Sequence, residues 1–168
     1  MLKIAQQATP CGKMYEPDRT DLKILDLLQR QGRMSMTELG EQVGLSTSPC
    51  SERVKRLERQ GLITGYHARV DPVALGKPLL VFMEITLSQK SPQVFEAIRR
   101  ELGSMPQVLE CHLISGSFDY LVKLRLRAMS EYRELLGTIL KKVPVPAQSN
   151  SYVVMEEVKE STVLSLDR

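Results

Sequence analysis

The pattern of helix starts and stops between residues 18 and 61 limits most strictly how this chain can fold. Ser35 precedes a glutamate by three residues, which is the spacing of a capping box at the start of a helix. Gly44 supplies the left-handed residue that ends this short helix, and Ser46 can cap the next one. Pro49 then falls in the first turn, where its missing N–H removes no hydrogen bond. With an apolar helical stripe before them, these signals predict three helices in a helix-turn-helix arrangement.

Short extended segments follow the third predicted helix, which ends at Gly61. Gly65 marks a bend within residues 62–70, where two short strands would form a wing. Met14 is an alternative start of the chain. The predicted segments are a flexible N-terminal tail at 1–17, a winged helix-turn-helix at 18–71, a linker at 72–78, a second domain at 79–160 and a C-terminal tail at 161–168.

The second half of the chain alternates between strand and helix patterns. Alternate side chains of its first strand are all apolar, which gives the sheet one buried face. The order strand, helix, strand, strand, helix, strand is the ferredoxin-like βαββαβ arrangement, with two helices on one face of an antiparallel sheet. The whole chain is therefore expected to be an α+β protein. The expected elements are strands at 79–87, 108–114, 120–126 and about 150–158, and helices at 92–102 and from a cap at Ser130.

The other face of the first strand is half apolar, with Leu80 and Phe82 next to Glu84 and Thr86. Two helices on one side of a sheet leave this second face uncovered. Monomeric proteins rarely expose a large contiguous apolar area. We therefore expect the sheets of two copies to pack face to face in a dimer with two-fold symmetry.

Positive charge is concentrated in the first half of the chain. Residues 1–77 carry the whole net charge of +3, and the charges of residues 78–168 cancel. Arg53, Lys55 and Arg56 fall on the third predicted helix, where they would meet a polyanion such as double-stranded DNA. A solvated helix face without a partner explains the same charges equally well.

The third predicted helix has the two sides that a helix needs in order to lie in the major groove of DNA. Cys50, Val54 and Leu57 cluster on one side as core residues, with Cys50 interpreted as a small buried apolar residue. The N-terminal end of the helix offers short hydroxyls, which recognise several bases weakly or serve only as caps. The predicted DNA-contact residues are Ser46, Thr47, Ser48, Ser51, Glu52, Arg53, Lys55 and Arg56.

The sequence disfavours several other classes of protein. No apolar run reaches the roughly 18 residues of a membrane span, and no signal peptide is recognisable, so we expect a cytoplasmic protein. Cys11, Cys50 and Cys111 form no CxxC pair and are interpreted as reduced thiols. His67 and His112 are not at metal-ligand spacing, so no metal site is expected. Without a nucleophile elbow or a phosphate loop, an enzyme is the weaker alternative, and no cofactor is expected.

Long strings of residues, in order along the chain, resemble the Lrp/AsnC (feast/famine) family of bacterial transcriptional regulators. They fall at 18–25, 44–58, 61–66, 80–87, 110–120 and 151–159. The resemblance implies a winged helix-turn-helix joined to a βαββαβ regulatory domain of the RAM or ACT-like kind. It also implies dimers that assemble into tetramers, octamers or higher rings, bind DNA in the nucleoid and respond to a free amino acid.

The resemblance places the amino-acid site between dimers, around the loop after the second strand of the regulatory domain. Gly116 lets a ligand approach the backbone closely, and Asp119 can accept hydrogen bonds from a ligand ammonium group. Without the resemblance, residues 116–119 are interpreted only as a tight turn, and Ser117 stands where the family often has an acidic residue. The effector residues implied by the resemblance are Leu113, Gly116, Ser117, Phe118, Asp119, Met129, Tyr152, Val153 and Val154.

The function expected from these observations is sequence-selective regulation of the genes of amino-acid metabolism. Leucine is the expected effector, and alanine, other branched amino acids, methionine and proline remain alternatives. A chromatin-like architectural protein that binds DNA broadly is a second alternative, because short hydroxyls give weak base recognition. Binding to defined and scrambled DNA, with and without an amino acid, separates these functions.

Overall fold

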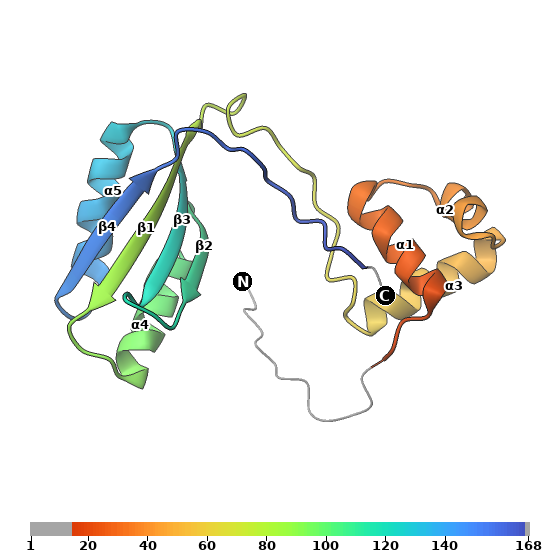
Figure 1. Ribbon diagram of the computed structural model, residues 1–168, viewed down its shortest axis with the longest axis horizontal. Coiled ribbons are helices and arrows are strands. Elements are labelled where there is room, and N and C mark those ends of the chain that lie inside the picture. The colour runs from red at the N-terminus through yellow and green to blue at the C-terminus, as the bar shows by residue number, and fades with distance from the viewer. Residues whose placement is uncertain (1–14, 167–168) are drawn as a thin grey trace. The chain divides into compact units, whose positions relative to one another are not determined.

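The computed structural model of the protein describes residues 15–166 and consists of two compact units (Figure 1). Unit 1 contains the described residues up to Ala68 and the segment from Glu160 onward, and unit 2 is the chain between them. Cys11, Met14 and most of the expected N-terminal tail lie outside the described residues. No helix in the described range is long and apolar enough to cross a membrane.

Unit 1 is built on three helices, as the sequence pattern predicts. They are α1 (Arg19–Arg30), α2 (Met36–Val43) and α3 (Thr47–Arg59). Asp18 and Ser35 form capping boxes at the starts of α1 and α2, each with the side chain three residues later. Gly44 adopts the left-handed conformation, with φ +74°, and ends α2, so that the chain can turn directly into α3.

The three helices pack around one apolar core. Gly40 allows a close approach to the turn after α2, since a Cβ at this position would lie 2.7 Å from the Leu45 carbonyl oxygen. Cys50 is fully buried, and burial raises the pKa of its thiol, as expected for a small core residue. The buried core residues are Ile24, Leu28, Leu39, Cys50, Val54 and Leu57.

Residues outside the three helices also belong to unit 1. Tyr15 packs against the core, although the sequence pattern assigns residues 1–17 to a flexible tail. Near the end of the chain, the Leu164 N–H donates to Oε1 of Gln29 on α1 at 2.8 Å. The Gln29 amide in turn donates to the Leu164 carbonyl at 3.3 Å. The chain therefore leaves unit 1 for unit 2 and then returns to it.

The two wing strands expected at residues 62–70 are absent. The structure has a turn and then irregular backbone in this segment. A lone two-stranded hairpin is at best marginally stable in water, which accounts for the difference. The Tyr66 hydroxyl holds the segment to α3 by donating to Glu58 at 3.0 Å. Burial and this carboxylate raise the pKa of Tyr66 to about 12.

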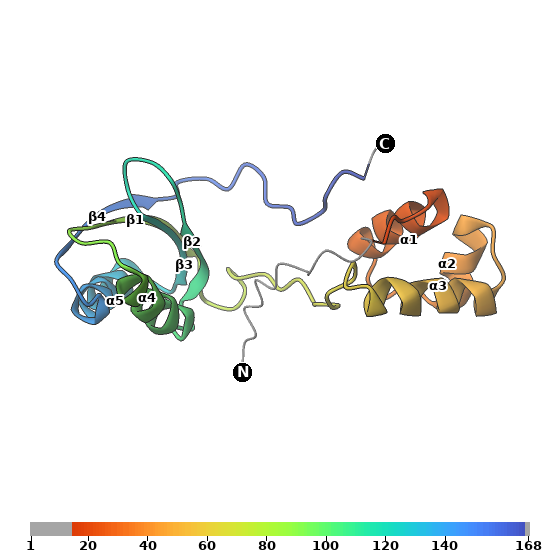
Figure 2. The ribbon, with the colours of Figure 1, turned by 90° about the horizontal axis from the view of Figure 1, so that it is seen from below.

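Unit 2 has the βαββαβ order that the sequence predicts. Its elements are β1 (Leu79–Leu87), α4 (Pro92–Gly103), β2 (Val108–Leu113), β3 (Tyr120–Leu126), α5 (Met129–Lys142) and β4 (Ala147–Val153). The antiparallel sheet has the strand order β2-β3-β1-β4, and α4 and α5 lie on one face of it (Figure 2). Ala128 is the N-cap of α5, so Ser130 lies inside the first turn and does not cap the helix as expected.

β4 starts and ends earlier than the sequence prediction of about 150–158. It pairs along β1 as far as Val153 opposite Val81, and the Val154 N–H then donates to the Leu80 carbonyl at 3.0 Å. Because β1 begins just before Leu80, no strand backbone is left for β4 to pair with beyond this point. The chain after β4 therefore continues as irregular backbone.

The helix-covered face of the sheet forms the core of unit 2, and alternate residues of β1 are buried there. The opposite face, here called the open face, carries Leu80, Phe82, Glu84 and Thr86 of β1 with their register partners on β3 and β4. The segment after β4 covers one end of this face. Glu157, in this segment, accepts two hydrogen bonds at 2.8 Å from Arg125 on β3. Leu80, the register partner of Arg125 on β1, is buried. The face that the sequence predicts to be uncovered is therefore accessible only from Phe82 toward the end of β1, near Thr86.

Candidate DNA-binding and effector sites

The outward side of α3 is the candidate DNA-reading surface of unit 1. Ser48, Glu52, Lys55 and Arg59 are exposed and recur at helical spacing, so they lie along one face. The Lys55 ammonium lies 3.3 Å from a carboxylate oxygen of Glu52. Both side chains are more than half exposed, so this ion pair is weak and exchangeable. Lys55 is therefore accessible to a phosphate group.

Hydroxyl groups surround the N-terminus of α3. Ser46 occupies the N-cap position, but its side chain makes no capping hydrogen bond, contrary to the sequence expectation. Ser46, Thr47 and Ser48 are exposed and Ser51 is half-buried. The Thr47 hydroxyl lies 3.4 Å from that of Thr37 on α2. The first turn has no acidic residue, so its free N–H groups and hydroxyls can face an anionic partner.

Arg53 and Arg56 of α3 turn toward the start of α1. Nη1 of Arg53 donates to Asp18 Oδ2 at 2.6 Å and to Asp21 Oδ1 at 2.8 Å. Nη2 of Arg56 donates to both carboxylate oxygens of Asp21 at 3.2 Å. Both arginines are among the residues predicted to contact DNA, and both have carboxylate partners inside unit 1.

Asp21 is fully buried at the centre of this cluster. It also accepts hydrogen bonds from the Tyr15 hydroxyl and from the Asp18 N–H. Burial acts to raise the pKa of Asp21, but the hydrogen bonds from Tyr15 and Arg53 hold it below its usual range. The Arg56 guanidinium lies 5.1 Å from the centroid of the Tyr15 ring, in cation–π contact. The cluster therefore ties α3 to α1 and to the residues before it.

The predicted site did not include Asp18 or Asp21, although the sequence carries a signal for Asp21. Ile24 and Leu28, three and seven residues after it, are core residues, so Asp21 falls on the buried stripe of α1. A carboxylate on a core stripe requires cationic or hydrogen-bonding partners. This reasoning identifies Asp21 as paired, but it does not show which cations pair with it.

The loop between β2 and β3 carries the first group of predicted effector residues. Leu113 is exposed at the end of β2, Ser117 is exposed and Phe118 is half-buried. Gly116 has φ +159°, and open space surrounds the position where a Cβ would stand. The tip of the loop is therefore accessible to a ligand or to another chain.

Asp119 closes this loop and is 5% exposed. Its Oδ2 accepts a hydrogen bond from the Leu87 N–H at 2.9 Å, and its Oδ1 lies 2.7 Å from the Lys90 ammonium. Burial acts to raise the pKa of Asp119, but the Leu87 N–H and the Lys90 ammonium hold it below its usual range. The Lys90 side chain is 57% exposed, so one oxygen of this carboxylate has an exchangeable partner.

The second group of predicted effector residues consists of Met129, Tyr152, Val153 and Val154. Leu113 on the edge strand β2 pairs with Tyr120 at the start of β3. Tyr152 on the other edge strand, β4, is in register with Lys123 through Phe82. Strand geometry separates Leu113 from Tyr152 by about 10 Å along the strands and about 14 Å across them. One chain therefore does not bring the two groups of predicted effector residues together.

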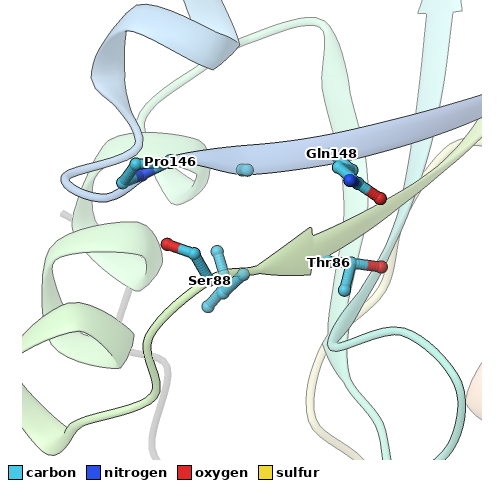
Figure 3. A pocket seen from close by; sticks show the side chains of 6 residues that line it. Thr86, Ser88, Pro146 and Gln148 are labelled. Atoms are coloured by element: carbon cyan, nitrogen blue, oxygen red, sulfur yellow. The ribbon is translucent and has the colours of Figure 1, made fainter.

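A shallow hollow of about 280 Å³ lies between the end of β1 and the start of β4 (Figure 3). Its lining residues are Thr86, Leu87, Ser88, Pro146, Ala147 and Gln148. None of these is charged or belongs to the predicted effector set, and small-molecule sites usually hold about 300–1,000 Å³. A zwitterion needs charged or donor groups for both of its ends. The hollow adjoins Asp119 through Leu87 but is not by itself a complete amino-acid site.

Two family models match the chain, one over each unit. The model of a winged helix-turn-helix DNA-binding domain matches residues 17–64, which include α1, α2 and α3. The model of the Lrp/AsnC ligand binding domain matches residues 80–164, which include all four strands of unit 2 except Leu79 at the start of β1.

Close relatives share both units. The leucine-responsive regulatory protein of Haemophilus influenzae is 51% identical over 149 residues, which cover 89% of this chain and 90% of that protein. The leucine-responsive regulatory protein of Escherichia coli K12 is 52% identical over 147 residues, which cover 88% of this chain and 90% of that protein. These relatives are regulators and not enzymes.

Solved structures with the same architecture include a transcriptional regulator of Neisseria meningitidis in complex with L-methionine. It has a TM-score of 0.84 and 34% identity, and the match covers 89% of this chain and 97% of that one. An AsnC family transcriptional regulator of Agrobacterium tumefaciens has a TM-score of 0.85 and 30% identity over the same shares of the two chains. The chain belongs to the Lrp/AsnC family of transcriptional regulators, with a DNA-binding winged helix-turn-helix and a ligand-binding domain.

Proposed function

We propose that the protein is a sequence-selective regulator of amino-acid metabolism whose assembly and DNA binding respond to leucine. The observation that carries the proposal is the 51% and 52% identity to two leucine-responsive regulatory proteins, over about nine tenths of each chain. Its place of action is the nucleoid in the cytoplasm. The geometry of the two units supports a specific division of labour.

On the DNA side, the hydroxyls at the start of α3 are the proposed base-reading groups. Ser46, Thr47 and Ser48 are exposed at the end of the helix that normally meets base edges, and Ser51 is half-buried behind them. Short hydroxyls bond to several bases, so they favour degenerate target sequences. Lys55, on the outward face, is the proposed phosphate contact.

On the regulatory side, the open face supports self-association. Phe82 is partly exposed there, and Tyr152 is 51% exposed with its hydroxyl donating to Glu84 at 3.1 Å. Glu110 pairs with Lys123 at 3.1 Å, and Glu84 accepts hydrogen bonds from Tyr152 and Asn150, so these charged groups of the face already have polar partners. Two copies can therefore bury the apolar side chains against each other, and higher assemblies can form from such dimers.

A neighbouring copy also supplies what one chain lacks at the proposed effector site. The loop group with Asp119 and the group with Tyr152 lie toward opposite ends of the sheet. Contact between the loop of one copy and the far end of another brings the two groups together. Asp119 would then accept the ligand ammonium in place of Lys90, and Leu113, Met129 and Val154 would contact a branched side chain.

A ligand held between copies changes the assembly only if it binds two assembly states with different affinities. Binding of leucine at such a contact is coupled by linkage to the spacing of the DNA-binding units. The L-methionine complex of the Neisseria regulator makes methionine the second candidate effector.

Fluorescence anisotropy of the full chain tests this function directly. The probes are a duplex from the DNA upstream of the protein's own coding region and a scrambled duplex, at one fixed salt concentration, with and without millimolar leucine. Selective binding that leucine shifts is the expected result. If methionine shifts the selective binding and leucine does not, the effector is methionine. Equal binding to both duplexes would favour an architectural protein.

Sedimentation velocity tests the role of the open face. Phe82→Glu places a charge in the proposed interface and should reduce the protein to monomers with an unchanged circular dichroism spectrum. DNA affinity should then fall by about 100-fold or more, because two linked reading heads become one. Gln93→Glu, an exposed substitution on α4, is the matched control. A variant at Phe82 that remains fully assembled would contradict this interface.

A further inference from the structure

The start of α1 engages two of the four cations of α3. Asp18 and Asp21 pair with Arg53 and Arg56 at distances of 2.6 to 3.2 Å. The other two cations of α3 are Lys55 and Arg59, and the helix also carries two glutamates. The helix as a whole carries a net positive charge. With Arg53 and Arg56 paired to the aspartates, the positive and negative charges of its other side chains balance.

Arg56 takes the inward conformation although one of its hydrogen-bond donors is left unsatisfied there. Its guanidinium contacts both carboxylate oxygens of Asp21 and the ring of Tyr15. Its Nε is buried and has no hydrogen-bond partner in the described part of the chain. An unsatisfied buried donor is unfavourable, and an outward side chain would give it water. The inward conformation therefore lacks one hydrogen bond at Nε and gains the contacts with Asp21 and Tyr15.

Arg53 is held in a different way. It contacts fully buried Asp21 and also Asp18, whose side chain is 52% exposed. The Arg53 side chain is itself 28% exposed. Asp18 therefore lies at the boundary between the buried cluster and the solvent, where a phosphate group can compete with it for Arg53.

We propose that Asp18 and Asp21 are specificity-determining residues of DNA binding, because they keep Arg53 and Arg56 from sequence-independent phosphate contacts. Phosphate contacts add affinity for every sequence alike. Withholding two of them lowers binding to non-target DNA while the hydroxyls at the start of α3 still read bases. The proposal rests on the role of α3 in DNA binding.

The salt dependence of binding separates this role from a purely structural one. Each phosphate contact contributes a slope of about −0.9 to a plot of log affinity against log salt concentration. Asp21→Asn removes the charge that holds both arginines, so the slope should become steeper by up to about 1.8 per DNA-binding unit. Affinity for the scrambled duplex should rise at low salt, and the ratio of specific to scrambled binding should fall.

Asp18→Asn is the milder variant and carries the test if Asp21→Asn does not fold. Asparagine is as good an N-cap as aspartate, so α1 keeps its start while Arg53 loses one carboxylate. The expected steepening is smaller, up to about 0.9. Adding Arg53→Gln to Asp18→Asn should return the slope to that of the unmodified protein, because the released cation is then absent.

Lys55→Gln is the matched control, since Lys55 is already exposed on the outward face. It should make the slope shallower by about 0.9, in the opposite direction to the aspartate variants. Folded aspartate variants with an unchanged or shallower slope would overturn the proposal and leave the two residues as structural. If the unmodified protein bound neither duplex, the failure would lie with the DNA-binding function itself and not with these residues.

Discussion

Among the residues that the structure describes, each unit buries one aspartate, and the two are held in different ways. Asp21 of unit 1 is fully buried and has partners fixed by the fold, namely two arginines of α3 and the Tyr15 hydroxyl. Asp119 of unit 2 is 5% exposed and bonds to the Leu87 N–H and to Lys90, whose side chain is mostly exposed. A buried carboxylate whose partners all belong to its own unit serves to position helices. A carboxylate whose cationic partner is exposed and exchangeable can instead bind the ammonium group of a ligand.

The same difference separates the two candidate sites. The candidate DNA-reading residues lie on a single helix and its N-cap and need no other chain to be brought together. The predicted effector residues lie at two ends of one sheet and need a neighbouring copy. Changes at Asp21 should therefore act within unit 1, and changes at Asp119 should also affect the response to the ligand.

Asp21→Ala should have the largest effect on stability. It leaves two cations without their buried partner, and we expect a loss of about 2–4 kcal/mol, below the value for a fully buried pair because both arginines are partly exposed. Hydrogen-exchange mass spectrometry should show reduced protection in α1 and α3 and little change in unit 2. Asp26→Ala on the same helix breaks an exposed pair with Arg30 and should cost far less than Asp21→Ala. Equal effects of the two variants would contradict the positioning role.

Asp119→Ala should have an intermediate effect. It leaves the Leu87 N–H without its acceptor, which corresponds to about 1–3 kcal/mol for a buried donor. Exposed Lys90 adds little to this loss. Hydrogen exchange should quicken at the end of β1, and anisotropy should show DNA binding retained with the amino-acid response lost. An unchanged response would remove Asp119 from the effector site.

Acidification should weaken unit 1 through the same carboxylates. The pKa values of Asp18 and Asp21 are lowered in the folded protein. Their contribution is therefore complete above the unfolded-state pKa of about 3.9 and is lost as the pH falls through the lower folded values. Acid unfolding followed by circular dichroism should begin below about pH 4, and Asp18→Asn should reduce the dependence on pH in that range. A variant with an unchanged acid transition would show that this carboxylate does not contribute.

The sequence predicted the helices of both units and the strand order of unit 2 because their signals are local. The capping box at Ser35, the left-handed Gly44 and the alternation along β1 each depend on a few neighbouring residues. The predicted end of β4 was wrong because the observed end depends on where β1 begins, and β1 is distant in the sequence. The expected wing strands are absent because the turn signals of residues 62–70 specify at most a lone two-stranded hairpin, which is only marginally stable in water.

The residues of the candidate sites could be predicted where they depend on local spacing and could not be predicted where they depend on contacts between distant residues. The outward face of α3 follows from helical spacing alone, and Lys55 lies where that spacing predicts. The turn of Arg56 toward Asp21 depends on a contact between residues 35 positions apart, which no local pattern reports. The separation of Leu113 from Tyr152 depends on strand order, which puts β2 and β4 on opposite edges.

Lys90→Gln should have the smallest effect on stability and gives the finest test of the comparison. It removes an exposed partner of Asp119, so the loss should be below about 1 kcal/mol. If a ligand ammonium takes the place of Lys90, the variant should respond at an amino-acid concentration about two- to fivefold lower, because a competitor worth up to about 1 kcal/mol is gone. Arg100→Gln, which removes an exposed charge from α4, should leave that concentration unchanged. A loss of response in Lys90→Gln would instead show that the lysine is part of the site. The partners of the Asp119 carboxylate would then be fixed within its own unit, as those of Asp21 are.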